Sequence, residues 1–403
     1  MIVRNEEKNL ARCLASVRGA VDEIIVVDTG STDGTAQLAR SLGAQVFSYE
    51  WQDDFAAARN ASLAHAHGDW VLVLDADEEL APGHGPRLRT LLAAPQYDWY
   101  FLECFTFLGG PGHPEQAQRG RVLRLFRGGL FEYRHAVHEE VTPVFESQNG
   151  RLMGTGPHSP PLGPGDSGLL ILHHGYEPGV AVHGQQAQAH SKASGAQLCP
   201  SGGSAGSARP PDPDPIREKA RRYVDLISRR LAETPADAYL HYALATDYTQ
   251  LGDFASALRE LFAAHELQGV WTSKLLLDTV QCLRSLHRYG EALDLLDEGF
   301  RLYPDFTDLY FIQGTLALDL ERPDLAQAAF RECLRRGEAP TRYTTTPGVG
   351  SYLAEYNLGV IAEVLGRTDE AAAHYRRAQA SAPQFRAAAE RLAALRCRQD
   401  PPK

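Results

Sequence analysis

The first part of the chain alternates apolar runs with amphipathic segments. We expect buried strands over residues 23–28, 44–49 and 70–74, where apolar or aromatic residues follow one another almost without a break. Leu10, Cys13, Leu14 and Val17 recur at the spacing of one helix face. Asn5 is the expected N-cap of that helix. The alternation of strands and helices predicts an α/β domain.

The pattern continues beyond residue 80 with longer strands. We expect a helix near residues 86–94 and strands at 99–108 and 121–127. Residues 169–172 form a last apolar run, which ends in His173 and His174. A further helix is expected over residues 54–67, where small residues allow close packing.

The C-terminal part has a different period. Leu251, Leu286, Leu320 and Leu365 are each followed six residues later by an alanine, at intervals of 35, 34 and 45 residues. The first two intervals match the 34-residue period of tetratricopeptide repeats, and the third fits one repeat plus an insertion near residues 337–350. We expect four repeats and a terminal helix near residues 386–396, which is enough for a stable solenoid.

Composition changes between the two parts. Residues 179–215 are rich in Gly, Ser, Ala, Gln and Pro, a composition typical of disordered segments. The expected organisation is therefore an α/β domain over 1–178, a disordered insertion over 179–215 and a tetratricopeptide-repeat domain over 216–397.

Charge and cysteine content narrow the function classes. The chain has 403 residues and a formal net charge of −11, with 40 basic against 51 acidic residues. This balance argues against nonspecific nucleic-acid binding. No apolar run is long enough to span a membrane, and no signal peptide is visible. The six cysteines form no C-x-x-C pair, which argues against a zinc site. Most of them fall in apolar helix or strand patterns, so buried reduced thiols and a cytoplasmic location are expected.

Candidate chemistry begins at the end of the strand at residues 70–74. Asp75 and Asp77 follow this strand, separated by one alanine. Ligands of open α/β sheets bind outside the carboxyl ends of the strands. There, one carboxylate can hold a hard divalent cation while the other accepts hydrogen bonds from a ribose or from metal-bound water. The alternative is an acidic, solvated loop without a function.

Four ordered motifs make the pair more specific. They are Val3-Arg4-Asn5-Glu6-Glu7, the segment at residues 25–35, Asp54-Phe-Ala-Ala-Ala-Arg59-Asn60, and Asp75-Ala-Asp77. In this order the set resembles the family 2 glycosyltransferases with the GT-A fold. More narrowly, it resembles the bacterial branch that joins such a domain to tetratricopeptide repeats, the relatives of the sublancin S-glycosyltransferase. The resemblance covers roughly residues 1–178 and 216–397.

The resemblance implies a nucleotide-sugar donor, with a UDP-hexose expected. It assigns the contacts with the base, ribose and diphosphate of the donor nucleotide to five residues: Arg4, Glu6, Asp28, Arg59 and Asp75. A fixed guanidinium such as that of Arg59 suits a diphosphate. Capping, solvation or an ordinary surface position are the alternatives for Arg4, Glu6 and Arg59.

The resemblance also implies a metal and a base. Asp77 would bind Mn²⁺ or Mg²⁺, and His173 would complete the metal shell or touch the diphosphate. An inverting displacement needs one base to take the acceptor proton. The pair His138-Glu139 follows the strand Arg124-Leu-Phe-Arg127, as in related sequences. Glu139 is the expected base, with His138 assisting or serving instead.

The repeats are expected to recruit a peptide, protein or glycan acceptor. Two other functions remain possible at this stage. Either the first strand is short, or the native N-terminus is longer. A short first strand would leave donor binding weak, which fits a catalytically weak protein that acts as a repeat-based adaptor. A sugar nucleotidyltransferase shares the sheet architecture, but its Gly-rich basic loop after the first strand is not present.

Overall fold

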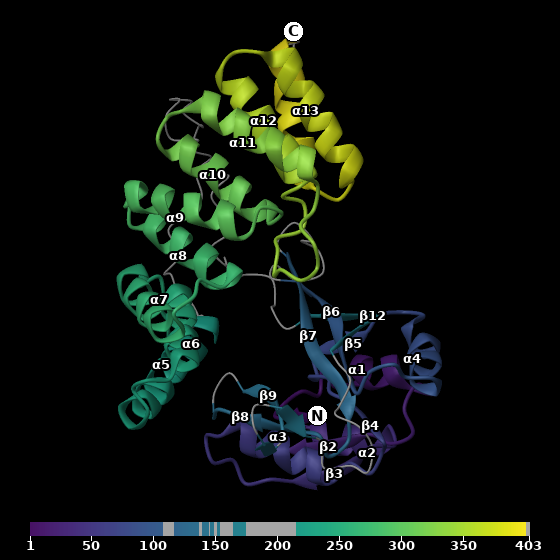
Figure 1. Ribbon diagram of the computed structural model, residues 1–403. Coiled ribbons are helices and arrows are strands. Elements are labelled where there is room, and N and C mark those ends of the chain that lie inside the picture. Colours follow the sequence, from purple (N-terminus) through teal and green to yellow (C-terminus); the bar gives the residue numbers. More distant parts are fainter. Residues whose placement is uncertain are drawn as a thin grey trace, which may run out of the picture. The chain divides into compact units, whose positions relative to one another are not determined.

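The computed structural model describes residues 1–107, 117–136, 139–144, 146–148, 151–153, 164–174 and 215–399. It divides into two compact units (Figure 1). The first contains Met1–Glu177 together with Pro340–Pro347, and the second contains Pro178–Ala339 together with Gly348–Lys403. His138 and most of the expected insertion at 179–215 lie outside the described residues. No described helix combines the length and the hydropathy that a bilayer crossing requires.

The first unit begins with a parallel three-stranded sheet. Its strands are β1 (Ile2–Val3), β2 (Ile25–Asp28) and β3 (Gln45–Ser48), in that order. The connecting helices are α1 (Leu10–Val17) and α2 (Thr35–Ser41). Val3, Leu10, Leu14 and Val26 are buried together between helix and sheet. The apolar face predicted for residues 10–17 is therefore confirmed as the buried face of α1.

A second sheet has five strands in the order β4-β7-β6-β12-β5. These are β4 (Trp70–Leu72), β5 (Glu78–Leu80), β6 (Trp99–Phe107), β7 (Ala117–Arg127) and β12 (Gly165–His173). Only β6 and β12 run parallel, whereas the other neighbours are antiparallel. Leu80, Tyr100, Leu125 and Ile171 lie in its core, which also includes α4 (His84–Ala93) through Leu88.

Shorter elements complete the unit. Helix α3 (Phe55–Ala64) begins at Asp54, whose carboxylate accepts the Ala57 N–H at 2.8 Å. Strand β8 (Phe131–Arg134) pairs with β9 (Glu140–Pro143), and β10 (Glu146–Gln148) pairs with β11 (Arg151–Met153). The amide of Asn60 bonds both the N–H and the C=O of Tyr133, at 2.8 and 2.9 Å, and so ties α3 to β8.

Two local expectations are wrong. Asn5 does not cap α1, because this helix begins at Leu10 and Asn5 adopts a left-handed backbone (φ 57°). Its side-chain oxygen instead accepts the Thr32 N–H at 2.7 Å, a use that asparagine in this conformation allows. The apolar run at 70–74 is not one strand, since β4 ends at Leu72, although Val73 and Leu74 stay buried.

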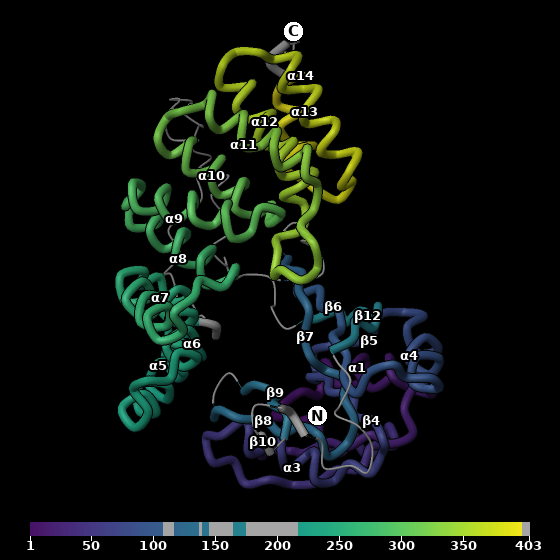
Figure 2. The backbone as a smooth tube through the Cα atoms, viewed as in Figure 1, coloured from purple at the N-terminus to yellow at the C-terminus, as the bar shows by residue number. Residues whose placement is uncertain are grey.

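In its described residues the second unit contains helices and no strands (Figure 2). After α5 (Pro215–Glu233), four helix pairs follow and α14 (Arg386–Gln399) ends the series. The pairs are α6 (Ala238–Leu251) with α7 (Phe254–Gln268), α8 (Ser273–Ser285) with α9 (Tyr289–Leu302), α10 (Thr307–Asp319) with α11 (Pro323–Arg336), and α12 (Tyr352–Val364) with α13 (Thr368–Ser381). The four predicted repeats and the terminal helix are confirmed.

The predicted insertion between the third and fourth repeats lies between α11 and α12. Its residues 340–347 belong to the first unit, where Thr345 exchanges two backbone hydrogen bonds with Arg119 of β7, at 2.8 and 2.9 Å. Gly120 of β7 accommodates this approach, because a Cβ there would lie 3.3 Å from the Thr344 hydroxyl. A segment from the repeat half of the sequence therefore completes the edge of the first unit.

Candidate active site

Asp77 and His173 lie side by side in the first unit. Asp77 directly precedes β5, and this strand pairs antiparallel with the end of β12, so that Glu78 lies opposite His173. The pairing places His173 Nε2 3.3 Å from Asp77 Oδ2. Burial disfavours the protonated imidazole, but the hydrogen bond and charge of Asp77 outweigh it and raise the pKa of His173. The structure brings the two predicted metal-binding residues together.

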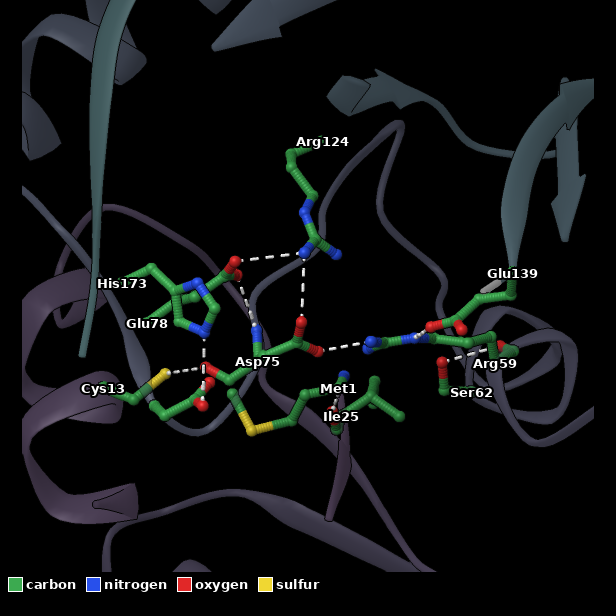
Figure 3. Close-up of polar contacts among 11 residues, drawn as sticks. Met1, Cys13, Ile25, Arg59, Ser62, Asp75, Glu78, Arg124, Glu139 and His173 are labelled. Carbon is green, nitrogen blue, oxygen red and sulfur yellow. Dashed lines mark hydrogen bonds and ion pairs between the residues drawn. The ribbon is translucent and has the colours of Figure 1, made fainter. Parts of the chain in front are cut away.

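Asp75 lies between two arginines (Figure 3). Arg59 donates to Oδ1, and Arg124 Nη2 donates to Oδ2 at 3.0 Å. Burial favours the protonated carboxyl, yet the two guanidinium groups hold the pKa of Asp75 well below its usual range. Asp75 is therefore an ionised carboxylate with a fixed direction.

Arg59 joins Asp75 to Glu139. Its Nε donates to Glu139 Oε1 at 3.1 Å while Nη2 bonds Asp75, and the residue is only 4% exposed. The guanidinium carbon lies 5.7 Å from the centre of the Tyr133 ring, a cation–π distance. The remaining nitrogen, Nη1, is buried and has no hydrogen-bond partner among the described residues. The predicted base and two predicted donor-binding residues thus form one connected group.

The other predicted donor-binding residues lie at the ends of β1 and β2. Asp28 is buried, and its Oδ1 accepts the N–H groups of Gly30 and Ser31 at 3.1 and 2.8 Å, which shapes the turn after β2. Glu6 is half-buried, and burial together with nearby Asp77 and Asp75 raises its pKa. Arg4 is exposed. The positions of Asp28, Glu6 and Arg4 do not test their contacts with a nucleotide, which stay predictions.

Sequence reasoning missed two residues of the site. In the sequence, Arg124 is only the first residue of the Arg124-Leu-Phe-Arg127 strand motif, and no pattern singles out Glu78. Glu78 is buried and Arg124 is half-buried, and Arg124 Nη2 lies 3.0 Å from Glu78 Oε1. An arginine inside a predicted strand, where a buried charge needs a partner, was the available signal. The partner itself depends on the pairing of β4 with β7.

The side chains of Asp77 and His173 supply part of the ligand set that a hard divalent cation needs. Asp77 and His173 offer one carboxylate and one imidazole from neighbouring strands. Among the described residues no group of three or more His, Cys, Asp or Glu side chains is arranged as a complete metal site. Mg²⁺ and Mn²⁺ commonly take few protein ligands and complete their shell with phosphate oxygens and water. The two side chains fit an ion of this kind that is shared with a diphosphate.

Comparison with known families divides the chain in the same way as the fold. Residues 1–149 match the glycosyl transferase family 2 model. Residues 277–341 and 313–385 match the tetratricopeptide repeat model. The predicted α/β domain followed by a tetratricopeptide-repeat domain is confirmed.

Individual relatives cover parts of the chain. A TPR repeat-containing protein of Synechococcus elongatus is 48% identical over 127 residues, 32% of this chain and 30% of that protein. The lipopolysaccharide core biosynthesis glycosyltransferase LpsC of Rhizobium meliloti is 34% identical over 38% of this chain and 58% of its own length. The SPbeta prophage-derived glycosyltransferase SunS of Bacillus subtilis is 31% identical over 35% of this chain and 33% of its own. The chain thus spans less than two thirds of each.

Proposed function

We propose that this protein moves a sugar from a nucleotide donor, expected to be a UDP-hexose, to an acceptor that the repeats recruit. The match of residues 1–149 to the glycosyl transferase family 2 model and the match of the repeats to the tetratricopeptide repeat model support this proposal. One observation carries the proposal. The Asp75-Ala-Asp77 motif, Arg59, Glu139 and His173 come from four separate segments and meet in one connected or adjacent group. Paired acids and a buried arginine of this kind suit a diphosphate leaving group.

We assign the donor contacts to the residues around this group. Asp75 would accept hydrogen bonds from the ribose, and Asp28, Glu6 and Arg4 would line the nucleoside side. Arg59 keeps Nη1 for a phosphate oxygen, because its other two nitrogens are engaged. Asp77 and His173 would hold Mn²⁺ or Mg²⁺, which neutralises charge on the leaving diphosphate when bound.

Glu139 is the residue we assign to the acceptor proton. Arg59 contacts its Oε1, so Oε2 is the oxygen that would take the proton as the acceptor attacks the sugar carbon from the opposite side to the leaving group. Attack from that side inverts the configuration. His138 is the alternative base and lies outside the described residues.

The repeat unit would hold a peptide, protein or glycan acceptor. A cavity of about 120 Å³ opens between α6, α7 and α8, lined by Tyr239, Tyr242, Gln268, Thr272, Lys274 and Leu275. The two tyrosine rings are suited to a side chain of a peptide or to a sugar ring, while the Lys274 ammonium and the Tyr242 hydroxyl bond Asp278. This supports recruitment by the repeats.

Calorimetric titration of UDP, with and without Mn²⁺, tests the donor site. We expect binding that Mn²⁺ strengthens in the wild-type protein, and loss of that metal effect in Asp77→Asn. Asp22→Asn is the matched control, because Asp22 is an exposed aspartate of the same unit that pairs with Arg89. Absence of binding by UDP, GDP and other nucleoside diphosphates would overturn the proposal.

A further inference from the structure

Glu78 and Arg124 form a closed ring of contacts around Asp75 (Figure 3). Glu78 Oε2 accepts the Asp75 N–H at 2.9 Å, and Glu78 Oε1 accepts from Arg124 Nη2 at 3.0 Å. The same nitrogen donates to Asp75 Oδ2 at 3.0 Å. The ring therefore ties the backbone of Asp75 to its own carboxylate through two other side chains.

The ring is built into the sheet. Glu78 is 2% exposed and begins β5, while the side chain of Arg124 is 17% exposed and comes from the middle of β7. The backbone of Arg124 is itself anchored, because its C=O accepts the Val73 N–H at 2.8 Å. Two residues before Asp75, the chain is thus already held against the strand that supplies the arginine.

Charge explains why all three groups are needed. The carboxylates of Asp75 and Glu78 both contact one nitrogen, so they lie close enough to repel each other strongly in a poorly solvated site. Arg124 supplies the positive charge between them. Without it, one carboxylate would turn away or take up a proton, and the turn at residues 75–78 would lose its shape.

Asp77 has a different partner. Its carboxylate faces His173, and its C=O accepts the His174 N–H at 2.9 Å. The ring orients Asp75, whereas β12 orients Asp77. The two aspartates of the Asp-Ala-Asp motif are therefore positioned by separate structures.

We propose that Glu78 and Arg124 are positioning residues that hold Asp75 in the direction needed to bind the nucleoside part of a nucleoside diphosphate. The inference rests on the proposed function, in which Asp75 contacts the ribose. It goes further because it assigns the geometry of Asp75 to these two residues. It does not assign to them the strengthening of UDP binding by Mn²⁺. Neither residue needs to touch the ligand.

Titration of UDP into Arg124→Gln, Glu78→Gln and the double variant tests the ring. Loss of an outer partner of this kind commonly costs about 10- to 100-fold in affinity, and we expect a weakening of that size. The factor by which Mn²⁺ strengthens binding should stay at the wild-type value. The double variant should bind about as well as the weaker single variant, because both changes open the same ring.

Arg124→Lys separates positioning from folding. Both contacts of Arg124 pass through one nitrogen, so a lysine ammonium can restore part of them and should recover part of the affinity. Arg119→Gln is the matched control. Arg119 lies on the same strand and pairs with Glu103 at 2.8 Å, away from Asp75, and its loss should leave the UDP affinity unchanged. Melting temperatures of all variants are measured alongside.

Three results would overturn the inference. One is wild-type affinity for UDP in Arg124→Gln and Glu78→Gln. The second is a loss of the Mn²⁺ effect in these variants, which would place the ring at the metal instead. The third is affinity that simply follows the melting temperature across the variants, Arg119→Gln included. If the wild-type protein binds no nucleoside diphosphate, the proposed function fails and this inference fails with it.

Discussion

The two units of the molecule use opposite ways of building an interior. In the repeat unit, neighbouring helices in the sequence pack against each other, and the repeated alanines Ala257, Ala292, Ala326 and Ala371 are fully buried. In the first unit, the central group at Asp75 joins side chains that are 80 residues apart, as in the Arg59–Glu139 pair. The repeat interior is local and apolar, whereas the candidate site of the first unit is long-range and charged.

This difference indicates which kind of substitution should destabilise each unit. A buried arginine with two carboxylate partners leaves unpaired charge when it is removed. A small residue under an aromatic ring leaves a steric clash when it is enlarged. Each kind of change should affect one unit and spare the other, and the following predictions test this from the largest expected effect to the smallest.

Arg59→Met should destabilise the first unit most. The change leaves Asp75 and Glu139 without their shared partner inside the unit, at an expected cost of about 3–5 kcal/mol. Hydrogen exchange followed by mass spectrometry should show faster exchange in α3 and β8, with α6 to α13 unchanged. Arg89→Met is the control, because the Arg89–Asp22 pair has side chains 45% and 87% exposed, and exposed ion pairs contribute little to stability. Equal effects of the two changes would contradict the role given to Arg59.

Gly314→Ala should act on the repeats alone. A Cβ at Gly314 would lie 2.7 Å from Cε1 of Phe330, a ring that is fully buried and cannot move aside. Overpacking of this kind costs about 1–3 kcal/mol, which urea unfolding of the repeat unit would measure. Gly290→Ala is the matched control, since nothing lies within 4 Å of its added Cβ. A stable Gly314→Ala protein would show that this contact is looser than described.

Thr345→Pro should destabilise the first unit, although Thr345 lies in the repeat half of the sequence. Proline removes the Thr345 N–H that donates to Arg119 C=O at 2.8 Å. The loss of one such bond costs about 0.5–1.5 kcal/mol. Faster hydrogen exchange of the β7 amides would report the loss of this bond. Thr345→Ala keeps the N–H and loses only the side chain, so the difference between the variants isolates the backbone bond. Identical exchange in β7 would argue against the pairing.

Glu355→Gln should change the acid sensitivity of the repeats. Burial favours the protonated form, but hydrogen bonds from His374 and Arg377 outweigh it and lower the pKa of Glu355. Its contribution is therefore present above the unfolded pKa of about 4.3 and is lost as pH falls through the lower folded pKa.

The melting temperature of the repeat unit should consequently fall less on acidification in Glu355→Gln than in the wild type. Glu266→Gln, at an exposed glutamate near the end of α7, is the control and should keep the wild-type slope. If both variants behave alike, the pair with His374 does not set the acid response.

The four cysteines whose side chains the structure describes have similar surroundings in the two units. Cys13, Cys104, Cys282 and Cys333 are buried and form no disulfide, as expected for reduced thiols. Burial raises the pKa of Cys13 to about 12 and that of Cys104 and Cys282 to about 11. Apolar packing therefore protects thiols equally well in the charged unit and in the repeats.

The sequence by itself determined the repeats, the alternation of strands and helices, and the position of Asp75 and Asp77 after a buried segment. These follow from period and composition, because the contacts behind them are close in the chain. It also predicted Arg59, Glu139 and His173 as site residues, through resemblance to a family, but not which groups they would touch.

Only the tertiary structure decided those contacts. His173 reaches Asp77 because β5 runs antiparallel to the end of β12, and Arg124 reaches Asp75 because β7 pairs with β4. Thr345 joins β7 although it lies between two repeats. Strand register sets which side chains share a face, and no local pattern encodes the register between segments so far apart.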